Sequence, residues 1–195
     1  MTDWADALEP AAPDVVAAWN GIDVGQFLSV RREVRRRSGP GSTDALVRQL
    51  AATAEALIAV VRTLPDDAFG LPGGEEDWTV AEAIGHDAAA RSGLVLAAAL
   101  AAADRWPPDA PQVVPSVPGP PGLDREDLVR KLEQSQRIIV RSARQIADHE
   151  TDPCPLDHPL VGRLRCGEWL LFAGVHDLMH LEQLRRIAGE LAARK

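Results

Sequence analysis

The sequence predicts an all-α protein in which four long helices form a bundle behind an N-terminal helical extension. Apolar residues recur at steps of three and four along several long stretches, which is the period of an amphipathic helix. Two proline-rich segments between the later helices predict long crossover loops. No stretch has the features of a convincing strand, because the best candidate, residues 113–117, is interrupted by Pro115.

Composition and charge are those of a soluble globular protein. The 195 residues are 46% apolar and 26% charged, with a net charge of −8, and they suffice for one core without disulfides. The negative charge argues against nucleic acid as a main partner, since duplex binding needs a basic face. The most apolar stretch, residues 94–103, is too short to span a bilayer, so we expect no membrane partner.

The expected location is the cytoplasm. The N-terminus carries neither the basic nor the apolar region of a signal peptide. In a reducing compartment Cys154 and Cys166 are expected to be free thiols.

Residues 1–39 form the predicted extension. Two helices are expected in it, at 3–8 and 14–37, the second broken at Gly21 and Gly25.

The basic run RREVRRR, residues 31–37, has two interpretations. A solvated helix face is favoured, and the alternative is contact with RNA, DNA or an acidic partner, which the overall negative charge argues against. The segment 38–42 (SGPGS) then breaks the chain. We therefore place the main domain at residues 40–195.

Four helices are predicted in the main domain. The second opens with a capping box, in which Thr79 is followed three residues later by Glu82. The third begins after Asp124, whose side chain suits an N-cap, and its acidic first turn complements the helix dipole. The expected spans are about 43–64, 79–105, 124–148 and 167–193.

The inward face of the second helix consists almost wholly of small residues, apart from His86. Small side chains let a neighbouring helix come close and leave room around an imidazole. The small residues of this face are Ala83, Ala90, Gly93 and Ala97.

Three histidines lie on predicted inward faces. His176 and His180 are four residues apart on the last helix, so both rings leave the same face, and His86 lies on the second helix. Three imidazoles on one ion would leave at least one coordination position open, as in catalytic zinc sites. Zinc, nickel, copper and iron(II) all suit such ligands. The alternative is that the three are core histidines that hold no metal.

Two segments carry a family resemblance. Residues 78–86 read WTVAEAIGH, and residues 167–170 (GEWL) lead to HDLMHLEQL at 176–184. With their helix order, these segments resemble the DinB-like superfamily of metal-dependent enzymes, which includes the YfiT-type thiol transferases and the N-terminal domain of mycothiol-dependent maleylpyruvate isomerase. The resemblance covers about residues 43–193 and leaves out residues 1–39.

The resemblance implies a DinB-type four-helix bundle with His86, His176 and His180 as ligands of a divalent metal ion, typically nickel or zinc. It also implies a small-molecule substrate, and members of the family often form homodimers. The chain departs from the family pattern at two positions, neither of which is a predicted ligand. The family often has Ser or Thr where this chain has Arg165, and a second His or an aromatic residue where it has Leu181.

Helical spacing suggests partners for the outer nitrogens of the rings, where an acceptor would orient each imidazole. Glu82 lies one turn before His86, although the capping box already explains it. Asp177 and Gln183 lie three residues before and after His180. In a separate segment, Cys154 and His158 share a loop at a spacing of four, where a second metal site or a nucleophilic pair is the alternative to a free thiol.

The leading functional hypothesis is a metal-dependent enzyme. By resemblance, the ion would activate a low-molecular-weight thiol such as mycothiol or bacillithiol for S-transfer, or water for hydrolysis. The alternative is a non-catalytic protein that binds metal or a partner in a stress response. An open pocket beside the histidines would favour the enzyme, and a site closed by a fourth protein ligand would favour a structural role.

Overall fold

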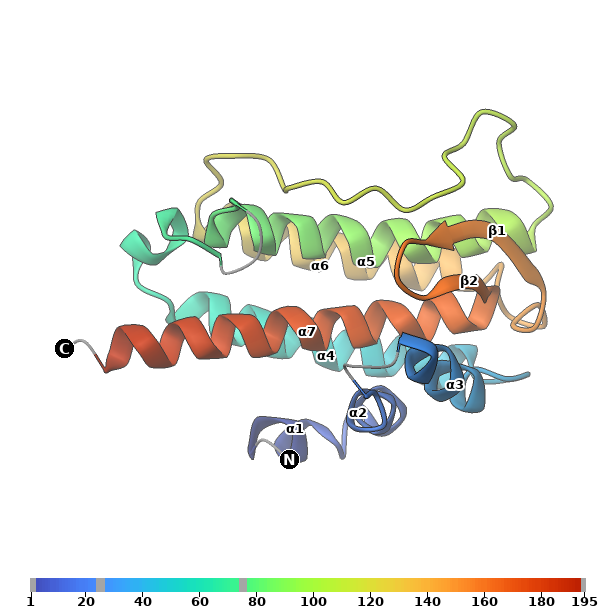
Figure 1. The fold of residues 1–195 in the computed structure, drawn as a ribbon, viewed down its shortest axis with the longest axis horizontal. Helices are drawn as coiled ribbons and strands as arrows, with labels where there is room; N and C mark the ends of the chain where they lie inside the picture. Colours follow the sequence, from blue (N-terminus) through green and yellow to red (C-terminus); the bar gives the residue numbers. More distant parts are fainter. Residues whose placement is uncertain (1–2, 24–26, 74–76, 194–195) are drawn as a thin grey trace.

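The computed structural model describes residues 3–23, 27–73 and 77–193 and confirms the all-α prediction. Four long helices form the bundle (Figure 1). Each of the first two packs against both of the last two, and the short 3-10 helix η1 (Asp66–Gly70) lies in the connection between the first and the second. The bundle helices are α4 (Thr43–Thr63), α5 (Val80–Ala102), α6 (Arg125–Ala143) and α7 (Cys166–Ala192).

Residues 103–124 form the long crossover that the sequence predicts. In Figure 1 this segment leaves the end of α5, runs back along the length of that helix and enters α6 at the opposite end, so that α5 and α6 run parallel. A tight turn could not make this connection, because it would reverse the chain direction.

The predicted helix starts are confirmed by their capping contacts. The backbone N–H of Thr79 donates to Glu82 Oε2 (2.8 Å), and the Glu82 N–H donates to the Thr79 hydroxyl (3.2 Å). The α6 start is capped by Asp124, which accepts the Asp127 N–H at 2.8 Å. At α7 an arginine occupies the cap, and Glu168 accepts the Arg165 backbone N–H at 2.9 Å. The glutamate therefore satisfies a donor that a Ser or Thr cap would leave to others.

The third bundle helix is shorter than predicted. It ends at Ala143 instead of near Asp148, and the chain continues in turns. Asp148 has a positive φ of 68°, a left-handed conformation that cannot continue a right-handed helix.

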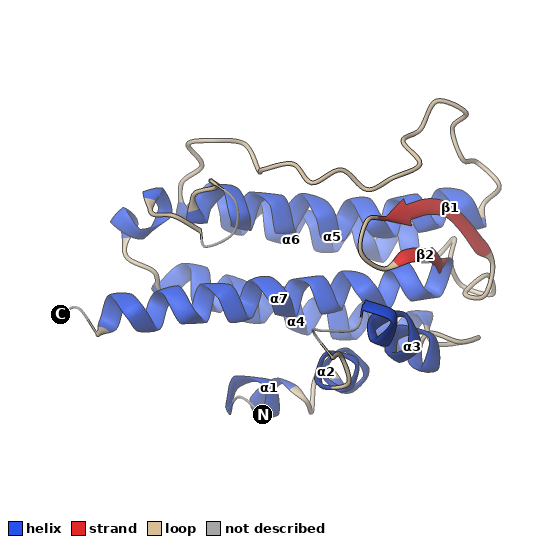
Figure 2. Ribbon diagram, viewed as in Figure 1, coloured by secondary structure: helices blue, strands red, loops and turns tan. Residues whose placement is uncertain are grey.

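The prediction of a plain loop at residues 150–164 was wrong. This segment contains an antiparallel hairpin of β1 (Pro153–His158) and β2 (Gly162–Arg165), shown in red in Figure 2. The prolines mislead because they occupy exposed positions, whereas the alternate residues Cys154 and Leu156 are buried. In a two-stranded sheet, prolines can occupy strand positions whose backbone nitrogen takes no part in the hydrogen bonds between the strands.

The predicted strand candidate at 113–117 makes only one bridge. Val113 pairs in parallel with Asp157. The Val114 N–H donates to the Asp157 carbonyl at 2.8 Å, and the Asp157 N–H donates to Gln112 at 2.7 Å. These bonds fasten the crossover to the hairpin.

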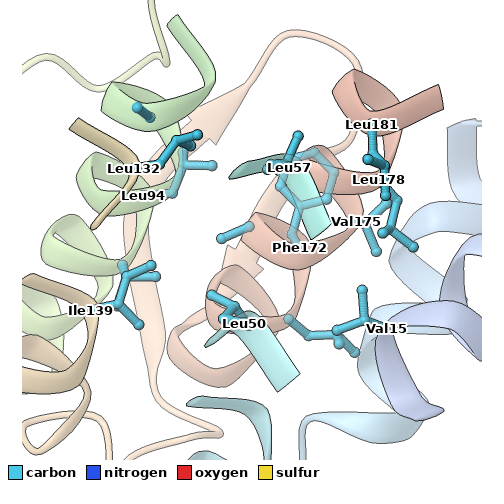
Figure 3. Packing of buried hydrophobic residues seen from close by; sticks show 14 of the residues in the cluster. Val15, Leu50, Leu57, Leu94, Leu132, Ile139, Phe172, Val175, Leu178 and Leu181 are labelled. Carbon is cyan, nitrogen blue, oxygen red and sulfur yellow. The ribbon is translucent and has the colours of Figure 1, made fainter. Parts of the chain in front are cut away.

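The N-terminal extension consists of three helices that share the core of the bundle. Figure 3 shows Val15 pointing into the same apolar cluster as Leu50 and Val175. The approach is close because α7 has Gly174 there, where a Cβ would lie 2.8 Å from Val15. The three helices are α1 (Asp3–Leu8), α2 (Pro13–Asn20) and α3 (Phe27–Arg37).

The basic run at the end of α3 pairs with glutamates. Arg35 donates to Glu168 at 2.6 Å, which ties the extension to the start of α7. Arg37 lies 2.7 Å from the buried carboxylate of Glu33, and hydrogen bonds from Arg32 and Arg37 lower the pKa of Glu33 to about 2. In the described part of the chain, no helix has the length and apolarity needed to cross a membrane.

A buried ion pair joins all four bundle helices. The side chains of Arg91 on α5 and Asp177 on α7 are both 0% exposed, and Arg91 Nε lies 3.0 Å from the carboxylate. Arg91 also donates to Ser135 of α6 (2.8 Å) and to the carbonyl of Leu50 of α4 (2.7 Å). Thr53 of α4 donates to the second oxygen of Asp177.

We expect Asp177→Ala to lower the free energy of unfolding by about 3–5 kcal/mol, because it leaves the Arg91 guanidinium buried without its counter-charge. Denaturant unfolding measures this loss. The matched control is Glu133→Ala, which breaks the exposed pair with Arg137 (4.0 Å) and should cost less than about 1 kcal/mol. Similar losses in the two variants would contradict the role given to the buried pair.

Candidate metal centre

The structure brings together the three histidines that helical spacing placed on inward faces. One candidate ligand nitrogen from each of His86, His176 and His180 lies within 4.8 Å of the others. The ring centroids of His176 and His180 are 4.7 Å apart, and His86 of α5 lies 5.3 and 5.5 Å from them. Two helices distant in sequence therefore present one cluster of imidazoles.

Each of the three rings has an acceptor at Nδ1. The His176 nitrogen lies 3.1 Å from the Asp87 carboxylate, and the His180 nitrogen lies 2.8 Å from Gln183 Oε1. The His86 nitrogen lies 2.7 Å from the carbonyl of Val117 in the crossover. All three partners are acceptors, so each requires the proton to be on Nδ1. An ion at the centre would therefore be bound through Nε2 of every ring.

Gln183 is held from two sides. Its amide nitrogen donates to the carbonyl of Gly73, which leaves the amide oxygen facing His180. Gly73 in turn is fixed by a backbone bond to the Trp78 carbonyl (2.7 Å) beside the start of α5. The sequence suggested Gln183 from its spacing, and the structure shows the contact that orients the ring.

Asp87 is the site residue that sequence reasoning missed. Its side chain is buried, and it reaches His176 from the opposite helix. Burial alone would raise its pKa, but the hydrogen bond with His176 and the charges of His180 and Arg91 lower it below its ordinary value. The available signal was a second carboxylate, after Glu82, in the mostly apolar first half of α5, one residue after His86.

The other two suggested partners lie elsewhere. Glu82 bonds to Thr79 in the capping box, and those bonds lower its pKa. Asp177 faces away from the cluster toward Arg91 and Thr53. Spacing along one helix identifies neighbours on that helix, whereas His176 takes its partner from another.

Burial favours the neutral form of the innermost ring. His180 is 7% exposed, and burial lowers its pKa. A neutral imidazole is the form that binds a metal, so no proton has to be displaced there at neutral pH.

A cavity of about 890 Å³ opens beside the histidines. Its walls come from α5, α7, the crossover and the hairpin, with Trp19 of α2, Val30 of α3 and residues 22–23. Trp78 stands at the histidine end, with its ring centroid 4.9 Å from that of His86. Among the described residues, the group of potential ligands holds only the three histidines, so no fourth protein ligand closes the site.

The two cysteines lie in the protein interior. Burial raises the pKa of Cys154, and it raises that of Cys166 to about 12, so neither thiol ionises at neutral pH. His158 does not face Cys154 as a base would. Its Nδ1 accepts the Leu160 N–H (3.2 Å), and its ring packs edge-on against Phe172.

The protein is therefore a helical bundle whose three inward histidines are compatible with a metal site. The sequence profile of the DinB superfamily matches residues 49–184, and the chain belongs to that superfamily. Neither the curated proteins nor the solved structures contain a match to this chain.

We expect acid to loosen the hairpin through His158. Burial lowers its pKa to about 4 from an ordinary value of 6.5, so the folded state holds the ring neutral. The stability due to this ring is complete above pH 6.5 and is lost as the pH falls toward 4, because the unfolded chain takes up the proton first.

Melting temperatures between pH 7.5 and 4 test this expectation. His158→Asn keeps an acceptor for the Leu160 N–H but cannot titrate, so its melting temperature should fall less over this range than that of the wild type. Identical pH profiles would show that His158 does not contribute.

Proposed function

We propose that this protein is a metal-dependent enzyme in which His86, His176 and His180 hold a divalent ion, nickel or zinc. The observation that carries the proposal is the shared orientation of the rings. Three separate acceptors fix Nδ1 of all three, and the rings meet at the end of a large cavity. Histidines that merely filled a core would need neither this convergence nor the space beside it.

The donor set fits such an ion. Nitrogen ligands suit nickel and zinc, and three protein ligands leave room for a substrate atom, as in catalytic zinc sites. A divalent ion bound there would supply Lewis acidity, which lowers the pKa of a thiol or of water to near neutrality.

The residues of the chain position and shield the reacting groups. Asp87 and Gln183 hold the rings of α7 in one orientation, and the Val117 carbonyl does so for His86. Trp78 covers one side of the cluster. We propose transfer of a low-molecular-weight thiol to an electrophilic small molecule as the reaction, in a protein of the cytoplasm.

The metal content of protein purified without a polyhistidine tag tests the site. We expect about one ion per chain in the wild type and none in His176→Ala, because two imidazoles hold an ion much more weakly than three. The control is His149→Ala, whose exposed ring bonds to Asp152 and whose loss should leave the metal content unchanged. A wild type without metal would refute the proposal.

Asp87→Asn separates positioning from ligation. The amide keeps the volume of the side chain but removes the negative charge facing His176, and we expect the affinity for the ion to fall about 10- to 100-fold. Competition with a chromogenic chelator measures this affinity. The matched control is Glu82→Gln, which neutralises a carboxylate outside the cluster.

Activity is tested by screening electrophilic small molecules with several low-molecular-weight thiols. We expect thiol consumption that chelation abolishes, that the added ion restores and that His86→Ala lacks. Activity retained in His86→Ala would contradict the mechanism. Product formation without any thiol would assign hydrolysis in place of S-transfer.

A further inference from the structure

The cavity is a long channel that follows α5. Its lining begins beside His86 and continues to Leu100, a span of about 21 Å along a helix. The small-residue face of α5 forms the floor, and no helix packs on it there. A Cβ added at Gly93 would meet nothing within 4 Å. The lining residues of this floor are Ala89, Ala90, Gly93 and Ala97.

The crossover is the roof of this channel and is fastened at both ends of the cavity. The Gly119 N–H donates to the carbonyl of Glu82 at 3.0 Å, near the Val117 contact with His86. At the other end, Val114 bonds to Asp157 of the hairpin. Figure 1 shows the segment lying along α5 over most of its length. The crossover therefore covers one side of the cavity, which stays open to solvent beside Ala89, Gly93 and Leu96.

The described lining of the channel places no charged side chain in its interior. No lysine or arginine is among its described lining residues. Its two acidic residues, Asp23 and Glu182, are both exposed at its margin. A charged group moved into an apolar site without a counter-charge loses several kcal/mol of hydration. The channel therefore selects against ions along its length.

Exposed apolar side chains gather where the channel meets solvent. Of the seven large apolar residues that are exposed in the described part of the chain, four line the cavity. Exposed apolar surface concentrated around a cavity is typical of a ligand site. These four are Leu96, Val117, Leu160 and Met179.

The N-terminal extension supplies part of the wall. Trp19, Ile22 and Val30 line the channel and belong to residues outside the 49–184 match. They add apolar surface to the wall from outside the matched segment.

We propose that the channel binds an elongated, uncharged and largely apolar molecule. Its apolar part lies along α5 under the crossover, and its reactive polar end lies at the three histidines. A volume of about 890 Å³ is in the range that encloses small organic ligands. Only the placement of the polar end rests on the proposed function. The binding of the apolar part does not require a metal.

Displacement of the neutral fluorophore N-phenyl-1-naphthylamine tests the proposal in the full-length protein with EDTA present. We expect the wild type to bind the probe and 1-decanol to displace it. Decanoate and decyltrimethylammonium have the same chain length but carry a charge, and they should displace it at least 10-fold less well at pH 7.5.

Two variants at one position locate the probe. Gly93→Leu extends a larger side chain from a position whose Cβ meets no atom within 4 Å and should weaken probe binding at least 10-fold, whereas Gly93→Ala adds one methyl group and should bind as the wild type does. Trp19→Ala should weaken binding several-fold if the extension forms the wall. Melting temperatures confirm that each variant is folded.

The outcomes separate the two proposals. Absence of probe binding, equal binding by Gly93→Leu and Gly93→Ala, or equal displacement by decanol and decanoate would each overturn the apolar channel. The probe assay contains EDTA, so probe binding does not depend on an ion at the histidines. Failure to find a metal would therefore refute the proposed function and leave the channel standing.

Discussion

The buried pair of Arg91 and Asp177 is the interaction on which the arrangement of the bundle depends. It contacts all four long helices, and it lies within one turn and a half of the histidines on both helices that carry them. Asp177 follows His176 directly, so one residue faces the core while its neighbour faces the cavity. A shift of α7 along α5 would break the ion pair and would also move the rings apart. The pair thereby sets the register that makes His86, His176 and His180 converge.

The orientation of the rings depends on a wider set of elements than their position does. His176 takes its partner from the opposite helix, His180 from the next turn of its own helix, and His86 from the crossover. The crossover is itself bonded to the hairpin, which packs on α5. An irregular connection between helices therefore determines which nitrogen His86 presents. The site is a property of the closed fold and not of two helices alone.

The sequence predicted what helical geometry controls and missed what tertiary contacts control. Periodicity and the Thr79 capping box placed the helices, and the same periodicity put His86 on a face directed toward His176 and His180. Asp87 could not be found in this way, because its partner lies 89 residues away on another helix. The hairpin was missed because prolines count against a strand in any local reading, and only the fold shows that Pro153 and Pro155 face solvent. The contact of His86 with Val117 could not be predicted either, because it is made by the backbone carbonyl and does not depend on the valine side chain.

The prolines of the crossover have a thermodynamic consequence for any molecule that lies beneath it. Each proline fixes one backbone dihedral angle and reduces the number of conformations open to the segment before anything binds. A glycine-rich roof of the same length would have to be immobilised by the ligand, and the entropy lost would subtract from affinity. This roof is preorganised. The free energy gained when the ligand buries apolar surface is therefore not offset by the entropy cost of ordering the crossover. The prolines of the crossover that line the channel are Pro107, Pro111, Pro115, Pro118 and Pro120.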